Sequence, residues 1–287
     1  MKYRILWVDD SPAWAKTMTE SVEDYLKDLG FDLDVQLHED SSRVAEFLAK
    51  EDVDLIAVDY KLTGPHGDKI IEDIRKSDNF TEILFYTADD DYRNILKPQD
   101  GVYRAHRTAV DAKIRKLIEL TLKRVQSPAN MRGVVIAETT DIEALLEDIL
   151  VAQFADKGDL FRCRVLDEGI YDFGKKYHFM MGLIKDRVKA CNVVLSGKEG
   201  DKEAAGELKG RLEPLQATLK EFEKEVIHTR NLLAHVKEQR DDQGRVTLKS
   251  TFRPGAITID HDWCVKVRKD LAKQRKALEE LTGISIG

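Results

Sequence analysis

The sequence lacks any hydrophobic run long enough to cross a membrane. A transmembrane helix needs about 18 apolar residues in succession, and no segment approaches that length. The chain begins Met1-Lys2-Tyr3-Arg4 and leads into a strand-like segment, which is not the pattern of a signal peptide. We therefore expect a cytoplasmic protein without a membrane partner.

Cysteine is scarce as well. The 3 cysteines, Cys163, Cys191 and Cys264, are far apart and show no C-x-x-C spacing. This pattern indicates neither a disulfide framework nor a zinc site, so we expect reduced thiols in the core. No internal repeat or low-complexity tract is visible. The 287 residues, 42% of them apolar, are enough for two domains with cores of their own.

Acidic excess is confined to the first half of the chain. Residues 1–131 hold 19 Lys and Arg against 26 Asp and Glu, whereas residues 132–287 hold 27 of each. A neutral second half does not exclude a nucleic-acid partner, because a local basic stripe can bind phosphates.

The first half alternates strand and helix patterns. Apolar runs predict five strands, at residues 5–8, 33–37, 55–58, 83–86 and 102–103. Helical periodicity between them is clearest at residues 12–29, 43–49 and 112–125. This alternation predicts an α/β fold with a doubly wound, five-stranded parallel sheet, whose functional loops lie at the carboxyl ends of the strands.

A second, mainly α-helical domain follows a break at Pro128. We predict one domain over residues 1–125, a linker over 126–131 and a helical domain over 132–287. Helical patterns cover residues 141–154 behind a Thr140 cap, 159–195 with a break near Gly174, 204–235 with Pro214 inside, and 261–281. Residues 245–252 and 257–259 form a strand, turn, strand pattern that predicts a β-hairpin.

Acidic side chains fall at the predicted strand ends. Asp9-Asp10 follows the first strand, Asp59 ends the third, and Thr87 ends the fourth. Carboxylates this close repel one another unless a cation lies among them, and Mg²⁺ prefers oxygen ligands. The pattern therefore predicts a phosphoryl-transfer site. The alternative is that these residues only occupy solvated loops.

In these motifs the chain resembles the response-regulator receiver (CheY-like) family. The resemblance covers Asp9-Asp10, the segment from Asp59 to Gly67, and Thr87-Ala88. It implies that Asp59 is the phosphoacceptor, and that a histidine kinase or small phosphodonor is the partner. It also implies Mg²⁺ bound by Asp10, Asp59 and the Lys61 backbone carbonyl, with Asp9 acting through the metal's waters. Thr87 and Tyr103 match the family's switch pair.

One departure concerns the Lys that the family carries three residues after the switch aromatic. This chain reads Tyr103-Arg104-Ala105-His106-Arg107, so His106 aligns with the Lys and Arg107 follows it. Arg is always charged and binds phosphate well through its planar fork. The alternative is a receiver that has lost phosphorylation and serves as a docking module.

The most distinctive motif of the second half spans residues 228–235. On a helix, His228, Asn231 and His235 share one face, and Arg230 is offset by about 100° but long enough to bend toward it. A neighbouring His and Arg can cleave RNA without metal, because His transfers protons and Arg stabilises the phosphorane charge.

This stretch resembles the HEPN superfamily, whose helical domains carry Arg, four to six residues, then His. Here Arg230, Asn231 and His235 match that pattern, and the resemblance spans residues 132–283. It implies a homodimer with a composite ribonuclease site that needs no cofactor. His228 would support the pocket. The alternative is that Arg230 and His235 only cap a helix end.

The last predicted helix carries a basic stripe of Lys266, Lys269, Lys273 and Lys276, opposite an apolar stripe. These lysines, with His228, are candidate RNA contacts. Such stripes are commonly just solvated faces.

Three hypotheses follow. The first is a phosphorylation-regulated ribonuclease, suited to stress signalling or antiphage defence. The second is a phosphorylation-gated, non-catalytic interaction or dimerisation module. The third, a DNA-binding transcription regulator, is weaker because no compact helix-turn-helix unit is visible.

Overall fold

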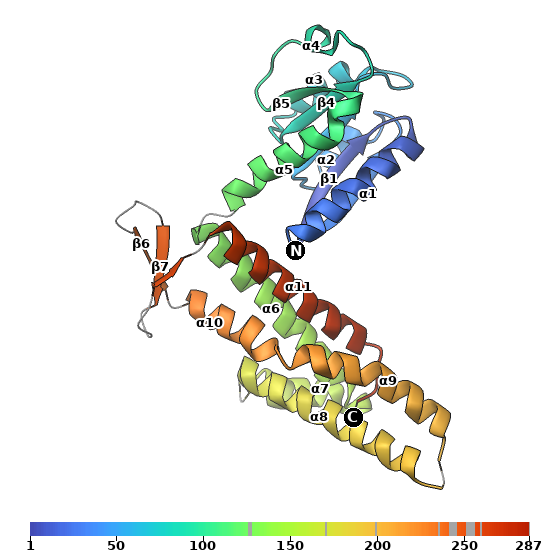
Figure 1. Cartoon of the computed structure of the whole chain (residues 1–287), viewed down its shortest axis with the longest axis vertical. Coiled ribbons are helices and arrows are strands. Elements are labelled where there is room, and N and C mark those ends of the chain that lie inside the picture. Colours follow the sequence, from blue (N-terminus) through green and yellow to red (C-terminus); the bar gives the residue numbers. More distant parts are fainter. Residues whose placement is uncertain are drawn as a thin grey trace. The chain divides into compact units, whose positions relative to one another are not determined.

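The computed structural model of the protein describes residues 1–125, 128–169, 171–198, 200–234, 236–240, 246–250, 256–258 and 260–286. The chain divides into two compact units, Met1–Ser127 and Pro128–Gly287 (Figure 1).

The first unit contains a five-stranded parallel sheet in the order β2-β1-β3-β4-β5. Its strands are β1 (Lys2–Val8), β2 (Asp32–His38), β3 (Leu55–Asp59), β4 (Ile83–Thr87) and β5 (Val102–His106). The predicted fold class and all five predicted strands are confirmed. β3 and β4 are buried along their whole length, as expected of central strands covered on both faces.

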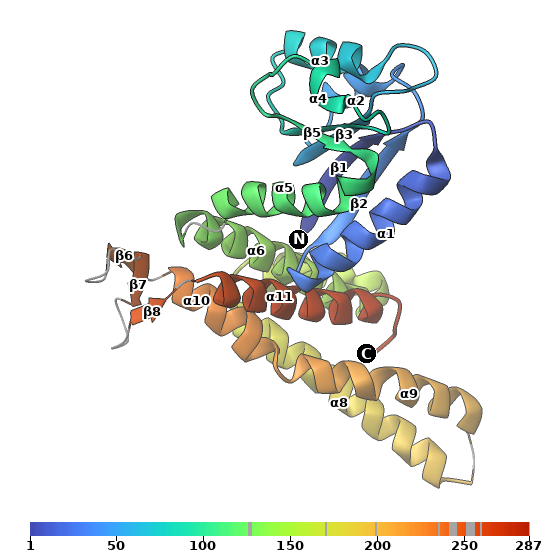
Figure 2. The ribbon, with the colours of Figure 1, turned by 45° about the horizontal axis from the view of Figure 1, so that its top comes forward.

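Helices cover both faces of this sheet (Figure 2). They are α1 (Pro12–Asp28), α2 (Val44–Leu48), α3 (Gly67–Lys76), α4 (Tyr92–Ile95) and α5 (Val110–Val125). Because side chains alternate along a strand, Ile5 and Trp7 pack with α1 and α5, whereas Leu6 and Val8 pack with α2 and α3. The two cores hold the strand ends in fixed positions.

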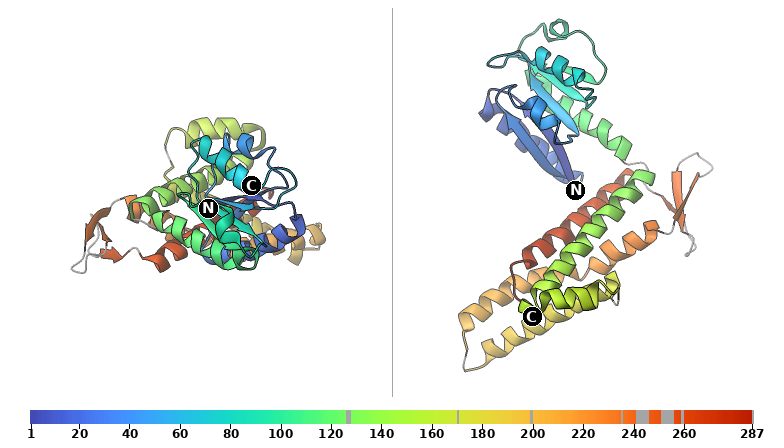
Figure 3. Two further views of the ribbon diagram at one scale, coloured as in Figure 1. Left: turned by 90° about the horizontal axis from the view of Figure 1, so that it is seen from above. Right: turned by 180° about the vertical axis from the view of Figure 1, so that it is seen from behind.

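The second unit is mainly helical. Its helices are α6 (Pro128–Ala152), α7 (Gly158–Phe161), α8 (Phe173–Ser196), α9 (Lys202–Leu219), α10 (His228–Ala234) and α11 (His261–Leu281). Seen from behind, α6 in green and α11 in dark red lie side by side (Figure 3). Their buried residues recur every three or four positions and include Val135, Ile142 and Leu146 on α6 and Val267, Leu271 and Leu278 on α11.

Two helix boundaries differ from the prediction. α6 begins at Pro128, so residues 128–131 of the predicted linker are helical. Pro is well suited to the first position of a helix, where its missing N–H is not needed. Thr140 therefore does not cap a helix but lies inside one, and its hydroxyl donates to the Ile136 carbonyl at 2.8 Å.

The predicted helix over 204–235 is also divided. α9 ends at Leu219, a π-helical turn covers Glu223–Ile227, and α10 ends at Ala234. A strand that the sequence pattern did not predict, β6 (Val236–Arg240), follows and pairs antiparallel with β7 (Val246–Ser250). β7 pairs in turn with β8 (Ala256–Thr258). Among the residues described, no helix is long and apolar enough to cross a bilayer.

Candidate functional site

The acidic residues of the first unit meet at one edge of the sheet. Asp9 directly follows β1, Asp59 is the last residue of β3, and Thr87 is the last residue of β4. These strands are adjacent and parallel, so their carboxyl ends share an edge. Asp9, Asp59 and Thr87 are all buried.

The three carboxylates form a compact cluster. Asp9, Asp10 and Asp59 each offer an oxygen within 4.8 Å of the others. Asp9 accepts hydrogen bonds from the Tyr86 hydroxyl at 2.6 Å and from the Ser11 N–H at 2.7 Å. Asp10 is exposed and accepts from the Thr63 hydroxyl at 2.9 Å. Neighbouring hydrogen-bond donors therefore orient the carboxylates of both Asp9 and Asp10.

Asp59 is the least satisfied of the three. Its Oδ1 is buried and accepts no hydrogen bond from the described residues. Burial, and then the neighbouring Asp9, raise the pKa of the Asp59 carboxyl to about 6. A buried carboxylate oxygen without a donor, beside two further carboxylates, fits a hard divalent cation such as Mg²⁺. Lys61 lies in the exposed loop two residues beyond Asp59.

A close backbone approach shapes this loop. Gly67 opens α3, and its N–H donates to the Tyr60 carbonyl at 2.9 Å. A Cβ at this position would lie 2.3 Å from the Asp59 carbonyl oxygen. Only glycine fits there without moving the end of β3.

The cation that reaches the carboxylates is Arg107. Its Nη1 lies 3.3 Å from Asp59 Oδ2, and its Nη2 lies 3.3 Å from Asp9 Oδ2. Its guanidinium carbon lies 4.2 Å from the centre of the Trp14 ring. Arg107 is the first residue after β5, in the 3₁₀ turn Arg107–Ala109.

His106, which the sequence aligned with the family's Lys, turns elsewhere. Its Nε2 lies 3.2 Å from the Ala88 carbonyl oxygen, and its Nδ1 lies 2.8 Å from the Thr108 hydroxyl. Successive side chains at a strand end leave the sheet in different directions, so only one of the pair faces the acidic cluster. Of the two residues that the sequence offered at this place, Arg107 and not His106 lies beside the carboxylates.

Thr87 and Tyr103, the two residues matched to the switch pair, differ in burial. Thr87 is fully buried, and its Oγ1 accepts from the Asp89 N–H at 3.3 Å. Tyr103 is the second residue of β5 and packs half-buried against the core, with Lys113 Nζ 5.4 Å from its ring centre. β5 pairs with β4 so that His106 lies opposite Thr87 and Tyr103 opposite Leu84.

The sequence interpretation missed an aromatic wall behind the cluster. The Tyr86 hydroxyl accepts from Trp7 Nε1 at 2.8 Å while it donates to Asp9. Burial raises the pKa of Tyr86 well above its ordinary value, and Asp9 adds to this, so the hydroxyl stays protonated. The Trp14 ring lies 5.3 Å from the Tyr86 ring. The only signal in the sequence was proximity, since Trp14 follows Asp10 by four residues.

In the second unit, Arg230 belongs to a charged network. Its Nη1 lies 3.0 Å from Glu143 Oε2, and its guanidinium carbon lies 5.4 Å from the centre of the Phe173 ring. Lys176, which is buried, pairs with Glu143 at 2.7 Å and Glu147 at 2.5 Å. These contacts join α6, α8 and α10.

The other residues of the Arg-His motif are placed only in part. His228 and Asn231 are exposed on α10. His235 lies outside the described residues. The four lysines of α11 are all exposed. Lys266 pairs with Asp270 at 2.5 Å, and Lys273 pairs with Glu225 at 2.7 Å. Lys269 and Lys276 form no ion pair with another described residue.

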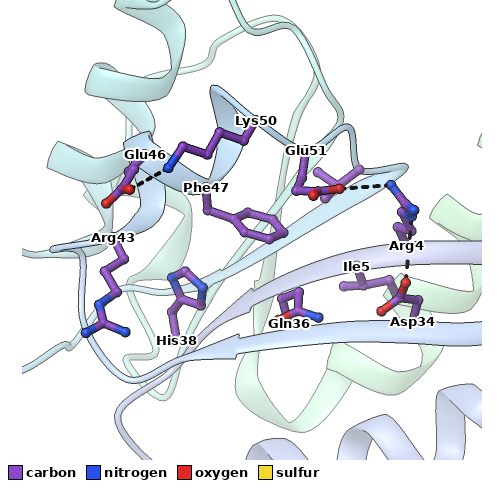
Figure 4. Close-up of a pocket in the computed structure, with 11 residues that line it drawn as sticks. Arg4, Ile5, Asp34, Gln36, His38, Arg43, Glu46, Phe47, Lys50 and Glu51 are labelled. Atoms are coloured by element: carbon purple, nitrogen blue, oxygen red, sulfur yellow. Dashed lines mark hydrogen bonds and ion pairs between the residues drawn. The ribbon is translucent and has the colours of Figure 1, made fainter.

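A separate pocket of about 760 Å³ lies between β1, β2 and α2 (Figure 4). Its lining carries both signs of charge. Arg4 pairs with Asp34 at 3.7 Å and with Glu51 at 3.2 Å, and Lys50 pairs with Glu46 at 2.7 Å. The pocket shares no residue with the acidic cluster.

Comparison with known proteins agrees with the geometry of the acidic edge. Residues 5–100 match the family model of the response regulator receiver domain. No curated protein matches the chain.

Solved structures resemble the first unit. The signal receiver domain of an HD domain-containing protein from Pseudomonas fluorescens is 18% identical, with 43% of this chain and 97% of that chain covered and a TM-score of 0.37. A response regulator protein from Thermotoga maritima, in complex with Mg²⁺ and BeF, is 25% identical to this chain. The match covers 41% of this chain and 99% of that chain, with a TM-score of 0.31.

Receiver domains bind Mg²⁺ at their acidic pocket, which here is the cluster of Asp9, Asp10 and Asp59. With the family match over residues 5–100, the parallel sheet and this cluster, the first unit is the receiver domain of a two-component response regulator.

Proposed function

We propose that Asp59 accepts a phosphoryl group from a histidine kinase or a small phosphodonor, and that this reaction controls the helical unit. The observation that carries the proposal is the buried carboxylate of Asp59, which lies beside Asp9 and Asp10. Its Oδ1 accepts no hydrogen bond from the described residues. An oxygen of this kind is free to act as a nucleophile.

In the reaction, an Asp59 oxygen attacks phosphorus. The new P–O bond of an acyl phosphate forms as the bond between phosphorus and the donor breaks, and the donor keeps the electron pair. Asp10, Asp59 and the Lys61 carbonyl would hold Mg²⁺, with Asp9 acting through its waters, and the ion when bound neutralises charge on the transferring group. Arg107 Nη1 lies 3.3 Å from Asp59 Oδ2, and Thr87 places its hydroxyl at the end of the adjacent strand β4.

The test uses acetyl phosphate and Mg²⁺ with the full chain. We expect one phosphoryl group on the wild type, detected by intact mass and by a phosphate-affinity gel, and none on Asp59→Ala. Asp28→Ala, which removes an exposed carboxylate at the end of α1, is the matched control and should react normally. Equal labelling of Asp59→Ala and the wild type would contradict the assignment.

For the helical unit we propose a metal-independent ribonuclease that acts as a homodimer, with Arg230, Asn231 and His235 as its catalytic group. Its support is the position of Arg230: Glu143 holds the guanidinium at 3.0 Å, and the side chain remains 31% exposed, so it can still meet a phosphate. Exposed His228 and Asn231 lie on the same helix, and Lys269 and Lys276 offer positive charge on α11.

The same ion pair favours a second function. Arg230 joined to Glu143 and, through it, to buried Lys176 also suits a helix anchor in a non-catalytic interaction module. Total RNA incubated with the protein, with and without beryllofluoride, separates the two. Cleavage by the wild type and by Arg164→Ala, an exposed arginine control, but not by Arg230→Ala or His235→Ala supports the enzyme. No cleavage in either state supports the interaction module.

A further inference from the structure

We propose that Trp14 is a positioning residue for Arg107. The indole keeps the guanidinium at the acidic edge, so that Arg107 supplies the cation that grips the phosphoryl group on Asp59. The inference rests on the proposed phosphorylation of Asp59 and adds to it the residue that holds the gripping cation in place.

Arg107 is contacted on two sides. The guanidinium carbon lies 4.2 Å from the Trp14 ring centre, within the range of a strong cation–π contact. The N–H groups face the carboxylates, 3.3 Å from Asp59 Oδ2 and 3.3 Å from Asp9 Oδ2. The three partners come from α1, β3 and the end of β1, so no single element fixes the arginine.

The hydrogen bonds from Arg107 to the carboxylates are long. Charge-assisted N–H···O bonds are commonly about 2.7–2.9 Å long. The three that Arg107 donates are longer, at 3.3 Å to Asp59 Oδ2, 3.3 Å to Asp9 Oδ2 and 3.4 Å to Asp9 Oδ1. Arg107 can therefore exchange a carboxylate oxygen for a phosphoryl oxygen at little cost. The contact with Trp14 involves the guanidinium carbon, 4.2 Å from the ring centre, and is separate from the N–H···O bonds that this exchange replaces.

The ring itself is held firmly. Trp14 lies in the first turn of α1, and its ring packs 5.3 Å from that of Tyr86 and 6.3 Å from that of Trp7. Tyr86 is tied to Asp9 and to Trp7 by hydrogen bonds of 2.6 and 2.8 Å. A long arginine side chain loses rotamer entropy when it is ordered. Contact with a fixed ring orders Arg107 before the phosphoryl group arrives, so that phosphoryl binding need not order it.

The neighbouring residue His106 makes its contacts away from Asp9 and Asp59. His106 Nε2 lies 3.2 Å from the Ala88 carbonyl and 3.8 Å from Asp90, on the loop after β4. Lys61, in the loop after β3, is exposed.

The first test measures the binding of beryllofluoride with Mg²⁺ to the full chain by calorimetry. Trp14→Leu should weaken binding roughly fivefold and Trp14→Phe less than about twofold, since Phe keeps a ring for the cation. Arg107→Ala should weaken it at least as much as Trp14→Leu, and adding Trp14→Leu to Arg107→Ala should have no further effect. Tyr25→Leu is the matched control, because it removes a similar contact elsewhere on α1, where the guanidinium carbon of Arg115 lies 4.9 Å from the centre of the Tyr25 ring.

A second measurement does not depend on folding stability. The Nε–H resonance of Arg107, assigned with Arg107→Lys, should carry a ring-current shift in the wild type and in Trp14→Phe but not in Trp14→Leu. The shift should persist when beryllofluoride is added.

The outcomes are separable. If the wild type binds no beryllofluoride, both the phosphoacceptor proposal and this inference are overturned. If the wild type binds but Trp14→Leu matches it, or if Trp14→Leu weakens Arg107→Ala further, only the role of Trp14 is overturned.

Discussion

Buried side chains at the acidic edge make stability depend on pH. The Asp59 carboxyl has a pKa of about 6 in the folded protein against 3.8 ordinarily, because burial and Asp9 disfavour its charge. The folded state thus holds the proton more tightly than the unfolded state. Stability attributable to this group is highest below pH 4 and is lost as the pH rises through about 6.

Asp59→Asn tests this dependence in EDTA. At pH 8 the substitution should raise the free energy of unfolding by roughly 2 kcal/mol, because it removes a buried charge. At pH 4 the gain should vanish, since wild-type Asp59 is then protonated. Urea unfolding at several pH values measures the difference, and a gain that does not change with pH would contradict the assigned pKa.

Gly67 is a second residue on which the stability of the receiver domain should depend. Gly67→Ala places a Cβ 2.3 Å from the Asp59 carbonyl oxygen, so it should lower the free energy of unfolding by about 1–3 kcal/mol. Gly182→Ala is the control, because a Cβ there meets nothing within 4 Å and α8 should gain about 1 kcal/mol. Thermal unfolding of the two variants compares them, and an unchanged midpoint for Gly67→Ala would contradict the close approach.

The packing of α8 against α6 in the second unit depends on paired charges. Lys176 on α8 is buried between Glu143 and Glu147 on α6, at 2.7 and 2.5 Å. Lys176→Met should lower the free energy of unfolding by about 3 kcal/mol, because two largely buried carboxylates lose the ammonium group that they share, and only Glu143 keeps a close partner in Arg230. Urea unfolding is the measurement.

A compensated variant is the control for Lys176. Adding Glu147→Gln to Lys176→Met should restore part of the loss, since Glu143 keeps its pair with Arg230 and Glu147 no longer carries a charge. A double variant as unstable as Lys176→Met alone would show that packing, and not charge, holds α6 to α8.

Helices and strands were predicted unequally well. The strands of the first unit followed from short apolar runs, because a central parallel strand is buried on both faces. The start of α6 did not follow, since Pro128 suits both a helix start and a linker, and distant packing decides between them. The break between α9 and α10 arises within a continuous helical pattern, where a π-helical turn leaves no signature in composition.

For the whole molecule, the two units should be separable. Both cores of the receiver domain, and every residue of its acidic cluster, lie within Met1–Ser127. A fragment of residues 1–127 should therefore fold and bind beryllofluoride with Mg²⁺ as the full chain does, within about threefold. Circular dichroism and calorimetry on the fragment provide the measurement. A fragment that folds but binds more than tenfold more weakly would show that the helical unit helps to form the site.

The sequence by itself determined the acidic edge, because a parallel sheet brings the carboxyl ends of its strands together and Asp9, Asp59 and Thr87 stand at those ends. Only the tertiary structure decided which cation and which rings surround that edge. Arg107 and His106 are neighbours in sequence, and their directions depend on how the end of β5 packs. Trp14 and Tyr86 meet from α1 and β4, a contact that no local pattern contains.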